Sequence, residues 1–209
     1  MPPEFLYFDL GNVLLTFDND RMCRQMGELL GADEASVRGF VMPTGGESDL
    51  QWRFECGLLS EAEYLQQVCD HFGASPDHAA LAVAASDIFA PIEPAMRLAD
   101  ALAKAGWRLG LLSNTNWAHW RFVMDGRYPV LRSAFEVEMT SFAAQSMKPD
   151  AGIYRRAIEA TGVPAERVFF TDDKPENVAS AREAGIDAVV FTSTEQLIAD
   201  LQSRGVIAE

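Results

Sequence analysis

The sequence predicts an α/β fold in which a parallel sheet carries helices on both faces and is interrupted by a helical insertion. Three observations support this prediction. Short apolar runs recur, and each stops abruptly at polar residues. From position 107 onward these runs alternate with helical patterns, as in parallel sheets. The stretch from about 18 to 91 has helical spacing and no convincing strand.

The apolar runs are predicted to be buried strands whose carboxyl ends carry polar side chains. The first run, FLYF, ends at Asp9, and a later one, rich in leucine, ends at Ser113. Two more lead into Thr171 and Thr192. The strands are expected at 5–8, 109–112, 168–170 and 188–191, with a weaker fifth strand at 135–139.

Helices are expected between these strands because capping residues and terminal glycines bracket each segment. The expected features are a helix at 93–104 that ends near Gly106, a helix capped by Asp150 that ends near Gly162, a helix with Pro175 in its first turn that ends near Gly185, and a last helix capped by Thr194.

The insertion contains two clear amphipathic patterns. Met22, Met26 and Leu30 keep helical spacing, and a second set runs from Tyr64 to Phe72. A polar turn at 43–48 separates the two sets, and an alanine-rich run at 79–85 is predicted to be plain helix.

Composition excludes several functions. The chain of 209 residues has 17 Lys and Arg against 31 Asp and Glu, a net charge of −14, which argues against nucleic-acid binding and a polybasic membrane anchor. No apolar run approaches the roughly 20 residues of a membrane span, and the start lacks the pattern of a signal peptide. Cys23, Cys56 and Cys69 match no zinc spacing and are expected to be reduced thiols. We therefore expect a cytoplasmic protein.

Polar residues at the ends of the strands are predicted to share one crevice, because ligands of open parallel sheets bind outside the carboxyl ends of the strands. These residues are Asp9, Ser113, Asn114, Asp172 and Asp173. Adjacent carboxylates repel one another unless a cation or protons lie between them. Oxygen ligands without softer neighbours favour Mg²⁺.

Lys148 precedes a proline and a predicted helix. Taken alone, such a lysine is usually a solvated charge. Beside three carboxylates and a metal it becomes a candidate clamp for phosphate or carboxylate.

Four motifs in order give the chain its resemblance to the haloacid dehalogenase superfamily of hydrolases. They are 8–14 (FDLGNVL), 112–115 (LSNT), 148–149 (KP) and 169–173 (FFTDD), the last followed by Asn177 and Val178. Each motif is weak alone, but together they span nearly the whole chain. The sequence most resembles the bacterial subgroup that acts on α-D-glucose 1-phosphate, which also has a segment matched by Glu55, Gly57 and Ser60.

The resemblance implies a Rossmann-like core at 1–16 and 92–209 and a helical cap at 17–91. It also implies that Asp9 is a nucleophile that forms an aspartyl-phosphate on a small phosphorylated metabolite. Ser113 and the backbone N–H of Asn114 would bind the phosphoryl oxygens, and Lys148 would offset their charge. Mg²⁺ would be held by Asp9, the carbonyl of Gly11, Asp173 and, directly or through an outer contact, Asp172.

Gly11 departs from the family pattern, because most phosphatases of the superfamily have an acid–base aspartate at that position. General acid–base catalysis is typically worth about 10²–10⁴-fold. Three interpretations remain open: a substrate with a good leaving group, such as an anomeric hydroxyl; a substitute acid, either Asp18, Asp20 or a cap residue such as Glu47; or a protein that binds a phosphorylated ligand without catalysis.

The superfamily's 2-haloacid dehalogenases also lack the second aspartate, and they need no Mg²⁺. Dehalogenases usually replace the pair Asp172 and Asp173 with uncharged residues, so the pair argues against this chemistry. Trp52, Arg53 and Trp117 are candidates for contacts with the substrate; His119 and Trp120 could also line the mouth of the crevice, although packing is their simpler role. The sequence does not predict the oligomeric state.

Overall fold

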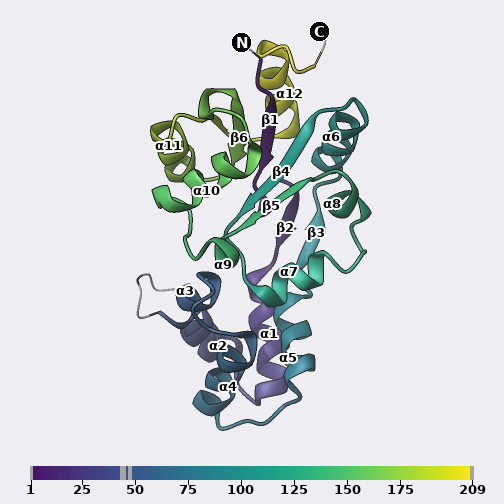
Figure 1. Cartoon of the computed structure of the whole chain (residues 1–209). Coiled ribbons are helices and arrows are strands. Elements are labelled where there is room, and N and C mark those ends of the chain that lie inside the picture. The colour runs from purple at the N-terminus through teal and green to yellow at the C-terminus, as the bar shows by residue number, and fades with distance from the viewer. Residues whose placement is uncertain (1, 43–45, 47–48, 208–209) are drawn as a thin grey trace.

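The computed structural model describes residues 2–42, 46 and 49–207, which form two lobes (Figure 1). The upper lobe contains the large sheet and both chain termini, which lie at the end away from the lower lobe. The lower lobe is helical and is built from one continuous stretch of the chain.

A five-stranded parallel sheet forms the centre of the upper lobe, in the order β5-β4-β1-β6-β7. The strands are β1 (Phe5–Phe8), β4 (Arg108–Ser113), β5 (Val137–Thr140), β6 (Val168–Asp172) and β7 (Asp187–Val190). The first strand of the chain is thus the central strand, with β4 and β6 as its neighbours. The strand order therefore reverses at β1, the place where such sheets bind ligands.

The apolar run of β1 is buried on both sides because helices cover both faces of the sheet. Phe5 and Tyr7 pack in the cluster that includes α10 and α11, whereas Leu6 and Phe8 pack in the cluster that includes α6 and α12. All four side chains are completely buried. This arrangement confirms the predicted α/β fold.

The helices of the upper lobe follow the expected alternation with strands. They are α6 (Glu93–Lys104), α7 (Trp117–Val123), α8 (Pro129–Ser133), α9 (Ser141–Ala144), α10 (Ala151–Thr161), α11 (Pro175–Glu183) and α12 (Thr194–Ser203), with a 3-10 turn at Ala165–Arg167. Two predicted caps need correction. Ser193 rather than Thr194 caps α12, and Asp150 occupies the cap position of α10 without a side-chain cap hydrogen bond. Ser193 makes the bond because its hydroxyl accepts from the backbone N–H of Gln196.

The lower lobe has an apolar core of its own, built from side chains of all five of its helices together with Ile88 and with Ala118 of α7. Its helices are α1 (Asn19–Leu30), α2 (Glu34–Val41), α3 (Leu50–Glu55), α4 (Glu61–Phe72) and α5 (His78–Ser86). Each begins after an N-cap whose side chain accepts a backbone N–H of the first turn: Asp18, Asp33, Asp49, Ser60 and Asp77. The sequence therefore encodes these helix starts locally.

A two-stranded antiparallel ribbon joins the lobes, formed by β2 (Leu15–Phe17) and β3 (Phe89–Pro91). The expectation of no strand between 18 and 91 was therefore wrong for β3. A three-residue strand is too short to produce a recognisable alternation, and its pairing partner is distant in sequence. The polar turn expected at 43–48 lies largely outside the described residues.

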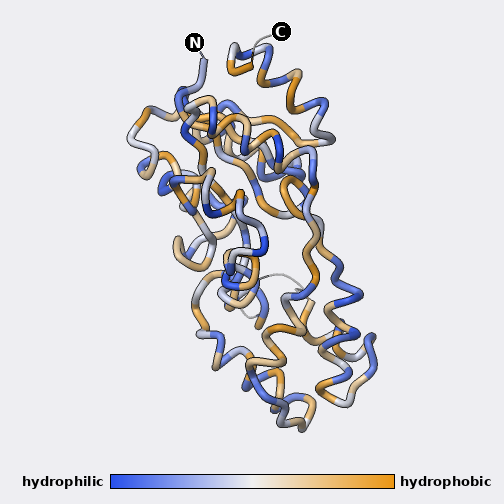
Figure 2. The backbone as a smooth tube through the Cα atoms, turned by 90° about the vertical axis from the view of Figure 1, so that its right-hand side faces the viewer, coloured by the Kyte–Doolittle hydropathy of each residue, from blue (hydrophilic) through white to orange (hydrophobic). Residues whose placement is uncertain are grey.

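Figure 2 shows hydrophobic and hydrophilic residues alternating along the helices of both lobes, as expected for helices with one buried face. Among the described residues, no helix has the length and apolar character needed to cross a membrane. The expectation for the cysteines is confirmed, since all three are buried and form no disulfide.

Candidate active site

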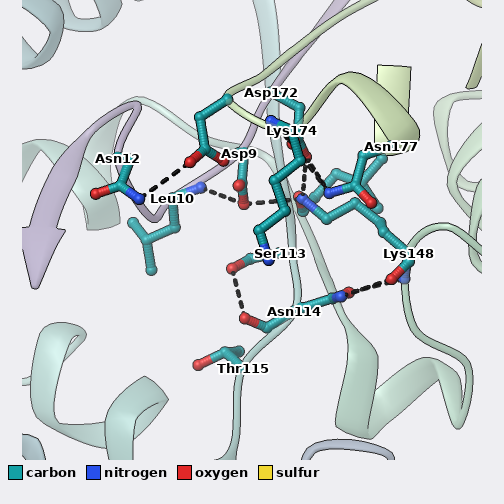
Figure 3. A network of polar contacts seen from close by, with 12 residues as sticks. Asp9, Leu10, Asn12, Ser113, Asn114, Thr115, Lys148, Asp172, Lys174 and Asn177 are labelled. Carbon is teal, nitrogen blue, oxygen red and sulfur yellow. Dashed lines mark hydrogen bonds and ion pairs between the residues drawn. The ribbon is translucent and has the colours of Figure 1, made fainter. Parts of the chain in front are cut away.

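The carboxyl ends of the three central strands bring the predicted site residues together (Figure 3). Asp9 directly follows β1, Ser113 is the last residue of β4, and Asp172 is the last residue of β6. β1 pairs in parallel with both neighbours, so these ends lie at one edge of the sheet. The short apolar strands thus place polar side chains from distant parts of the sequence in one crevice.

Lys148 lies at the centre of this group and is almost completely buried. Its ammonium lies 2.9 Å from Asp9 Oδ1 and donates hydrogen bonds to Asp172 Oδ2 (2.5 Å) and to the carbonyl of Leu112 (2.8 Å). Burial would by itself lower the pKa of Lys148, but the two carboxylates outweigh it and raise the pKa above its usual value. Lys148 is therefore a permanently charged group, fixed by three oxygens.

The carboxyl group of Asp9 is buried, and its Oδ1 accepts the backbone N–H of Leu10 at 2.7 Å. Burial is the main cause that raises the pKa of Asp9 to about 6; Lys148 acts in the opposite direction and Asp172 adds to the rise. The single positive charge of Lys148 therefore does not balance the negative charges of the carboxylates in this crevice. A further cation beside Asp9 would favour the carboxylate form that a nucleophile needs.

Asp172 is the most completely hydrogen-bonded carboxylate of the group. Its Oδ1 accepts the backbone N–H of Lys174 (2.8 Å) and the side-chain amide of Asn177 (2.9 Å). Its Oδ2 accepts the same amide at 3.1 Å as well as Lys148. From the sequence, Asp172 was expected either to bind the metal directly or to contact it only indirectly. These hydrogen bonds favour the indirect role, in which Asp172 orients Lys148.

Asn177 was quoted with the fourth motif but was given no role from the sequence. It lies in the first turn of α11, and its backbone carbonyl accepts the hydroxyl of Tyr154 at 2.8 Å. The only sequence signal for the contact between Asn177 and Asp172 was an asparagine five residues after an aspartate at a predicted strand end.

The carboxylates of Asp9, Asp172 and Asp173 offer oxygens that all lie within 4.8 Å of one another. Asp173 is partly exposed, and its Oδ2 accepts the side-chain amide of Asn12 at 3.0 Å. Three carboxylates beside one lysine form an oxygen-only donor set with excess negative charge, which fits a hard divalent cation. Gly11, whose carbonyl was the fourth predicted ligand, lies beside Asn12 on the loop that follows β1.

The side chain of Asn114, for which the sequence predicted no partner, contacts the backbone of Lys148. Its side-chain amide donates to the carbonyl of Lys148, and its side-chain oxygen accepts the backbone N–H of Lys148, both at 2.8 Å. This reciprocal pair fixes the loop that carries Lys148. The side chain of Asn114 therefore positions the lysine, while Ser113 and Asn114 both line the adjacent cavity.

The space beside Gly11, where the usual acid–base aspartate would project, is bounded by an aromatic ring. A Cβ built on Gly11 would lie 3.0 Å from the ring of Phe17, which belongs to the ribbon strand β2. A side chain at position 11 would therefore require the ring to move. The missing aspartate is thus accompanied by an apolar neighbour.

A cavity of about 350 Å³ opens between this strand edge and the helical lobe. Its lining residues come from both lobes and from the ribbon: Leu10, Gly11, Phe17, Asn19, Met22, Val41, Met42, Gln51, Trp52, Glu55, Ile88, Phe89, Ser113, Asn114, Thr115, His119, Met147 and Lys174. About half of these side chains are apolar, and most of the apolar ones lie on the helical lobe and the ribbon.

The structure separates the three predicted substrate contacts. Trp52 of α3 lines the cavity, whereas Arg53 and Trp117 are not among its lining residues. Trp117 is half exposed and packs against Phe142 with ring centroids 4.2 Å apart. Gln51 and Lys174 do line the cavity, although the sequence analysis gave them no role. Gln51 and Lys174 reach the cavity because of the way α3 and the start of α11 are placed in the fold. No local sequence pattern encodes this placement.

His119 lines the cavity but is engaged in structural hydrogen bonds. Its Nε2 lies 3.1 Å from the carbonyl of Ala85 in α5, and its Nδ1 lies 3.2 Å from the side-chain amide of Asn116. The carbonyl can only accept, so Nε2 carries the proton and Nδ1 accepts from Asn116. Burial lowers the pKa of His119 to about 4, which keeps the ring neutral and joins α7 to the helical lobe.

The acids considered as substitutes for the missing aspartate lie elsewhere. Asp18 caps α1 by accepting the backbone N–H of Arg21 at 2.8 Å, and Asp20 pairs with Arg38. Neither lines the cavity. Glu47, the third candidate, lies outside the described residues.

A family model for haloacid dehalogenase-like hydrolases matches residues 8–185 of this chain. The chain therefore belongs to this family, as the four motifs indicated. The finer resemblance to the glucose 1-phosphate subgroup is not established by this match.

Similar proteins agree with the family assignment. The chain is 32% identical over 98 residues to a phosphoglycolate phosphatase of Rhodospirillum rubrum, and the aligned part spans 47% of this chain and only 40% of that protein. A haloacid dehalogenase family enzyme of Bacteroides thetaiotaomicron, solved with magnesium and inorganic phosphate, has a TM-score of 0.80 at 22% identity and covers 91% of this chain and 94% of its own. A predicted haloacid dehalogenase-like family hydrolase from Porphyromonas gingivalis has a TM-score of 0.79 at 25% identity, and the match covers 97% of this chain and 98% of that one.

Proposed function

We propose that this hydrolase is a magnesium-dependent phosphatase that removes the phosphoryl group from a small phosphate monoester through an aspartyl-phosphate on Asp9. The observation that carries the proposal is the grouping of three carboxylates around one buried lysine at the carboxyl edge of the sheet. The enzyme of Bacteroides thetaiotaomicron with a similar fold was solved with magnesium and phosphate, which supports the choice of metal and ligand.

The charge of the site favours phosphoryl transfer over dehalogenation. Without a cation, Asp9, Asp172 and Asp173 outnumber Lys148 and would repel any anionic substrate. Displacement of a halide needs no metal, so this arrangement of carboxylates has no use in that reaction. The transfer of a phosphoryl group, in contrast, gains most from positive charge near the oxygens of that group.

The residues then have separate tasks. Asp9 attacks phosphorus, and Lys148 offsets the charge of the carboxylate and the phosphoryl oxygens. Ser113 and the backbone of Asn114 hydrogen-bond the phosphoryl group. Asp9, Asp173 and the carbonyl of Gly11 would hold Mg²⁺, with Asp172 in outer contact, and the bound metal would add positive charge at the transferring group.

The helical lobe has the position expected of a cap, which we assign to 17–91, with the core at 1–16 and 92–209. Its side chains form much of the wall of a 350 Å³ cavity that Leu10 and Gly11, the residues after Asp9, also line, so the leaving group would lie against this lobe. A wall of this kind excludes water from the reaction. It also makes the cap, rather than the core, the part that selects the substrate.

The substrate we favour is a sugar 1-phosphate. An anomeric hydroxyl is a better leaving group than an ordinary alcohol, which would lessen the need for an acid at position 11. Gln51 and Asn19 in the cavity could hydrogen-bond hydroxyls, and Trp52 could stack on a sugar ring. The relative that is a phosphoglycolate phosphatase indicates that a small phosphorylated acid is a useful second substrate to assay.

Release of phosphate from a panel of sugar phosphates and phosphoglycolate, with and without EDTA, tests this proposal. We expect turnover with Mg²⁺ and its loss on chelation, and we expect Asp9→Asn to abolish turnover while the protein remains folded. Turnover that survives chelation would exclude the metal role, and full activity of Asp9→Asn would exclude the nucleophile.

Two other functions are possible outcomes of these assays. The glycine at position 11 is compatible with a binder without catalysis, and the superfamily also contains 2-haloacid dehalogenases. A binder without catalysis would show thermal stabilisation by a phosphorylated ligand but no phosphate release from any compound of the panel. A dehalogenase would release chloride from 2-chloropropionate. Either result would replace the phosphatase proposal.

A further inference from the structure

The reaction proposed above needs a group that handles the proton of the leaving group, and position 11 offers none. Phe17 lies against the space that a side chain there would take. Among the described residues that line the cavity, Glu55 of α3 is the only carboxylic acid. It faces the same cavity as Gly11 and Ser113, but it comes from the helical lobe.

Local structure fixes the side chain of Glu55. Glu55 is the last residue of α3, a helix whose N-cap is Asp49. One turn earlier, the buried side chain of Gln51 donates a hydrogen bond to Glu55 Oε1 at 2.7 Å. This bond uses one carboxyl oxygen and orients the group within the cavity.

The turn after Glu55 lies directly on the upper lobe. Gly57 has φ +67°, and a Cβ built on it would lie 2.2 Å from the carbonyl oxygen of Phe142 in α9. Only glycine allows so close an approach. The end of α3 is therefore held at a fixed distance from the strand edge, which is what a group acting on the substrate requires.

The charges around Glu55 also suit proton transfer. Burial raises the pKa of its carboxyl group; Gln51 and Lys174 act in the opposite direction, and Asp49 adds to the rise. The phenol of Tyr64 in α4 also interacts electrostatically with Glu55, and α9, which also packs on α3, has no titratable residue. Lys174, which follows Asp172 and Asp173 in sequence, lines the same cavity as Glu55.

We infer that Glu55 is the catalytic acid and base of this enzyme, supplied by the helical lobe in place of a side chain at position 11. The inference rests on the proposed phosphatase function. In the first step Asp9 Oδ bonds to phosphorus, the bond from phosphorus to the leaving oxygen breaks, and that oxygen keeps the electron pair and takes the proton of Glu55.

In the second step the Glu55 carboxylate takes a proton from water while the water oxygen bonds to phosphorus. The bond between phosphorus and Asp9 breaks, and its electron pair returns to the Asp9 carboxylate. Phosphate leaves, and Glu55 is again protonated. No other reactant is needed.

The test is a leaving-group comparison with Glu55→Gln, which keeps the size of the side chain and removes its proton. Two substrates are used: an alkyl phosphate, whose leaving alkoxide needs a proton, and p-nitrophenyl phosphate, whose leaving phenolate does not. For the variant we expect kcat/KM to fall about 10²-fold or more with the alkyl phosphate and less than about tenfold with the aryl phosphate. We also expect a burst of nitrophenol equal to the enzyme concentration, because loss of the base slows hydrolysis of the aspartyl-phosphate.

The matched control is Glu28→Gln, which removes an exposed carboxylate from α1 of the same lobe and should leave both rates unchanged. A merely structural or binding role of Glu55 would lower kcat/KM by the same factor for both substrates, and this result would overturn the inference. Unchanged kinetics in Glu55→Gln would overturn it as well. Thermal melting of both variants shows whether the fold is intact, and Glu55→Asp, which retains an acid, should recover part of the alkyl phosphate activity.

Failure of the proposed function would look different. A wild-type protein that turns over neither substrate, or an Asp9→Asn variant as active as the wild type, overturns the phosphatase and this inference together. If only the role of Glu55 is wrong, the contrast between wild type and Asp9→Asn persists and the leaving-group difference does not appear.

Discussion

The two ends of the cavity are built in different ways. At the strand edge, Lys148 and Asp172 are buried and joined to each other, and the backbone of Lys148 is held by Asn114. At the opposite end, the wall from the helical lobe consists mainly of apolar side chains such as Met22 and Trp52. One end is a connected polar network and the other is a hydrophobic surface with a few polar groups.

Apart from Glu55, which we infer to act on the leaving group from the helical lobe, this difference separates chemistry from selection. A polar network whose charges are already oriented stabilises the transferring group without reorganisation, whatever the rest of the substrate is. An apolar wall recognises size and shape, and it can change without disturbing the network. We therefore expect variants at the strand edge to slow all substrates alike, and variants at the helical end to change the preference among substrates.

Lys148→Met should have the largest effect. The variant removes the only ammonium that contacts both Asp9 and Asp172 in the described residues, so kcat should fall by about 10²–10³ for every substrate. Steady-state assays on substrates with different leaving groups measure this factor. Lys104→Met, which removes an exposed lysine of α6, is the control.

The same variant leaves two buried carboxylates without their cation, which should lower the free energy of unfolding by about 3–5 kcal/mol. Added Mg²⁺ should recover part of this loss, because it would bind only the folded site. Urea denaturation with and without Mg²⁺ measures both quantities. A loss of activity that differs strongly among substrates would contradict the separation of the two ends.

Trp52→Ala should have a smaller and selective effect. Removing the indole from the apolar wall should lower kcat/KM about tenfold for a substrate with a bulky leaving group, with little change for a small one such as phosphoglycolate. Trp117→Ala is the matched control, since Trp117 is half exposed and does not line the cavity. An equal loss for large and small substrates would show that Trp52 supports the fold rather than the leaving group.

His119→Gln should have the smallest effect, at the contact between the two lobes. The pKa of His119 is about 4 in the folded protein and near 6.5 in the unfolded chain, so the unfolded chain binds the extra proton between these values. The neutral ring therefore stabilises the fold above pH 6.5, and this stability is lost as the pH falls towards 4.

We expect the wild type to lose on the order of 1 kcal/mol more stability than His119→Gln between pH 7 and pH 5. Urea midpoints at the two pH values measure the difference. Parallel pH profiles for the two proteins would show that His119 is not held neutral by the contact with Ala85.

Much of the fold could be predicted because its signals are local. The run FLYF is buried on both faces, so it contains no polar residue until Asp9, and the glycines that end α6, α10 and α11 follow their last helical turns. The fifth strand was predicted to begin two residues and to end one residue too early, because β5 is at the edge of the sheet and only one of its four residues is buried. The strand β3 was missed because its pairing with β2 joins positions about 74 residues apart.

The residues of the site also fall into those that the sequence predicted and those that it did not. The identities of Asp9, Ser113, Asp172 and Asp173 follow from the sequence, since each lies where an apolar run ends. Lys148 follows no apolar run and was selected from its motif and from the carboxylates expected nearby. The sequence did not distinguish Trp52 from Arg53, because neighbouring residues of a helix point in different directions and the orientation of α3 was unknown. It also gave no reason to connect Glu55 with Gly11.

The sequence by itself determined the chemical groups at the strand edge, because the hydrophobic pattern fixes where each strand ends and hence which side chains lie there. The tertiary structure decided what faces those groups. The ring of Phe17 beside Gly11, the turn at Gly57 on Phe142 and the carboxyl group of Glu55 in the cavity all depend on how the helical lobe packs on the sheet. Such packing arises from contacts between residues distant in the chain, and no periodicity in one segment can encode it.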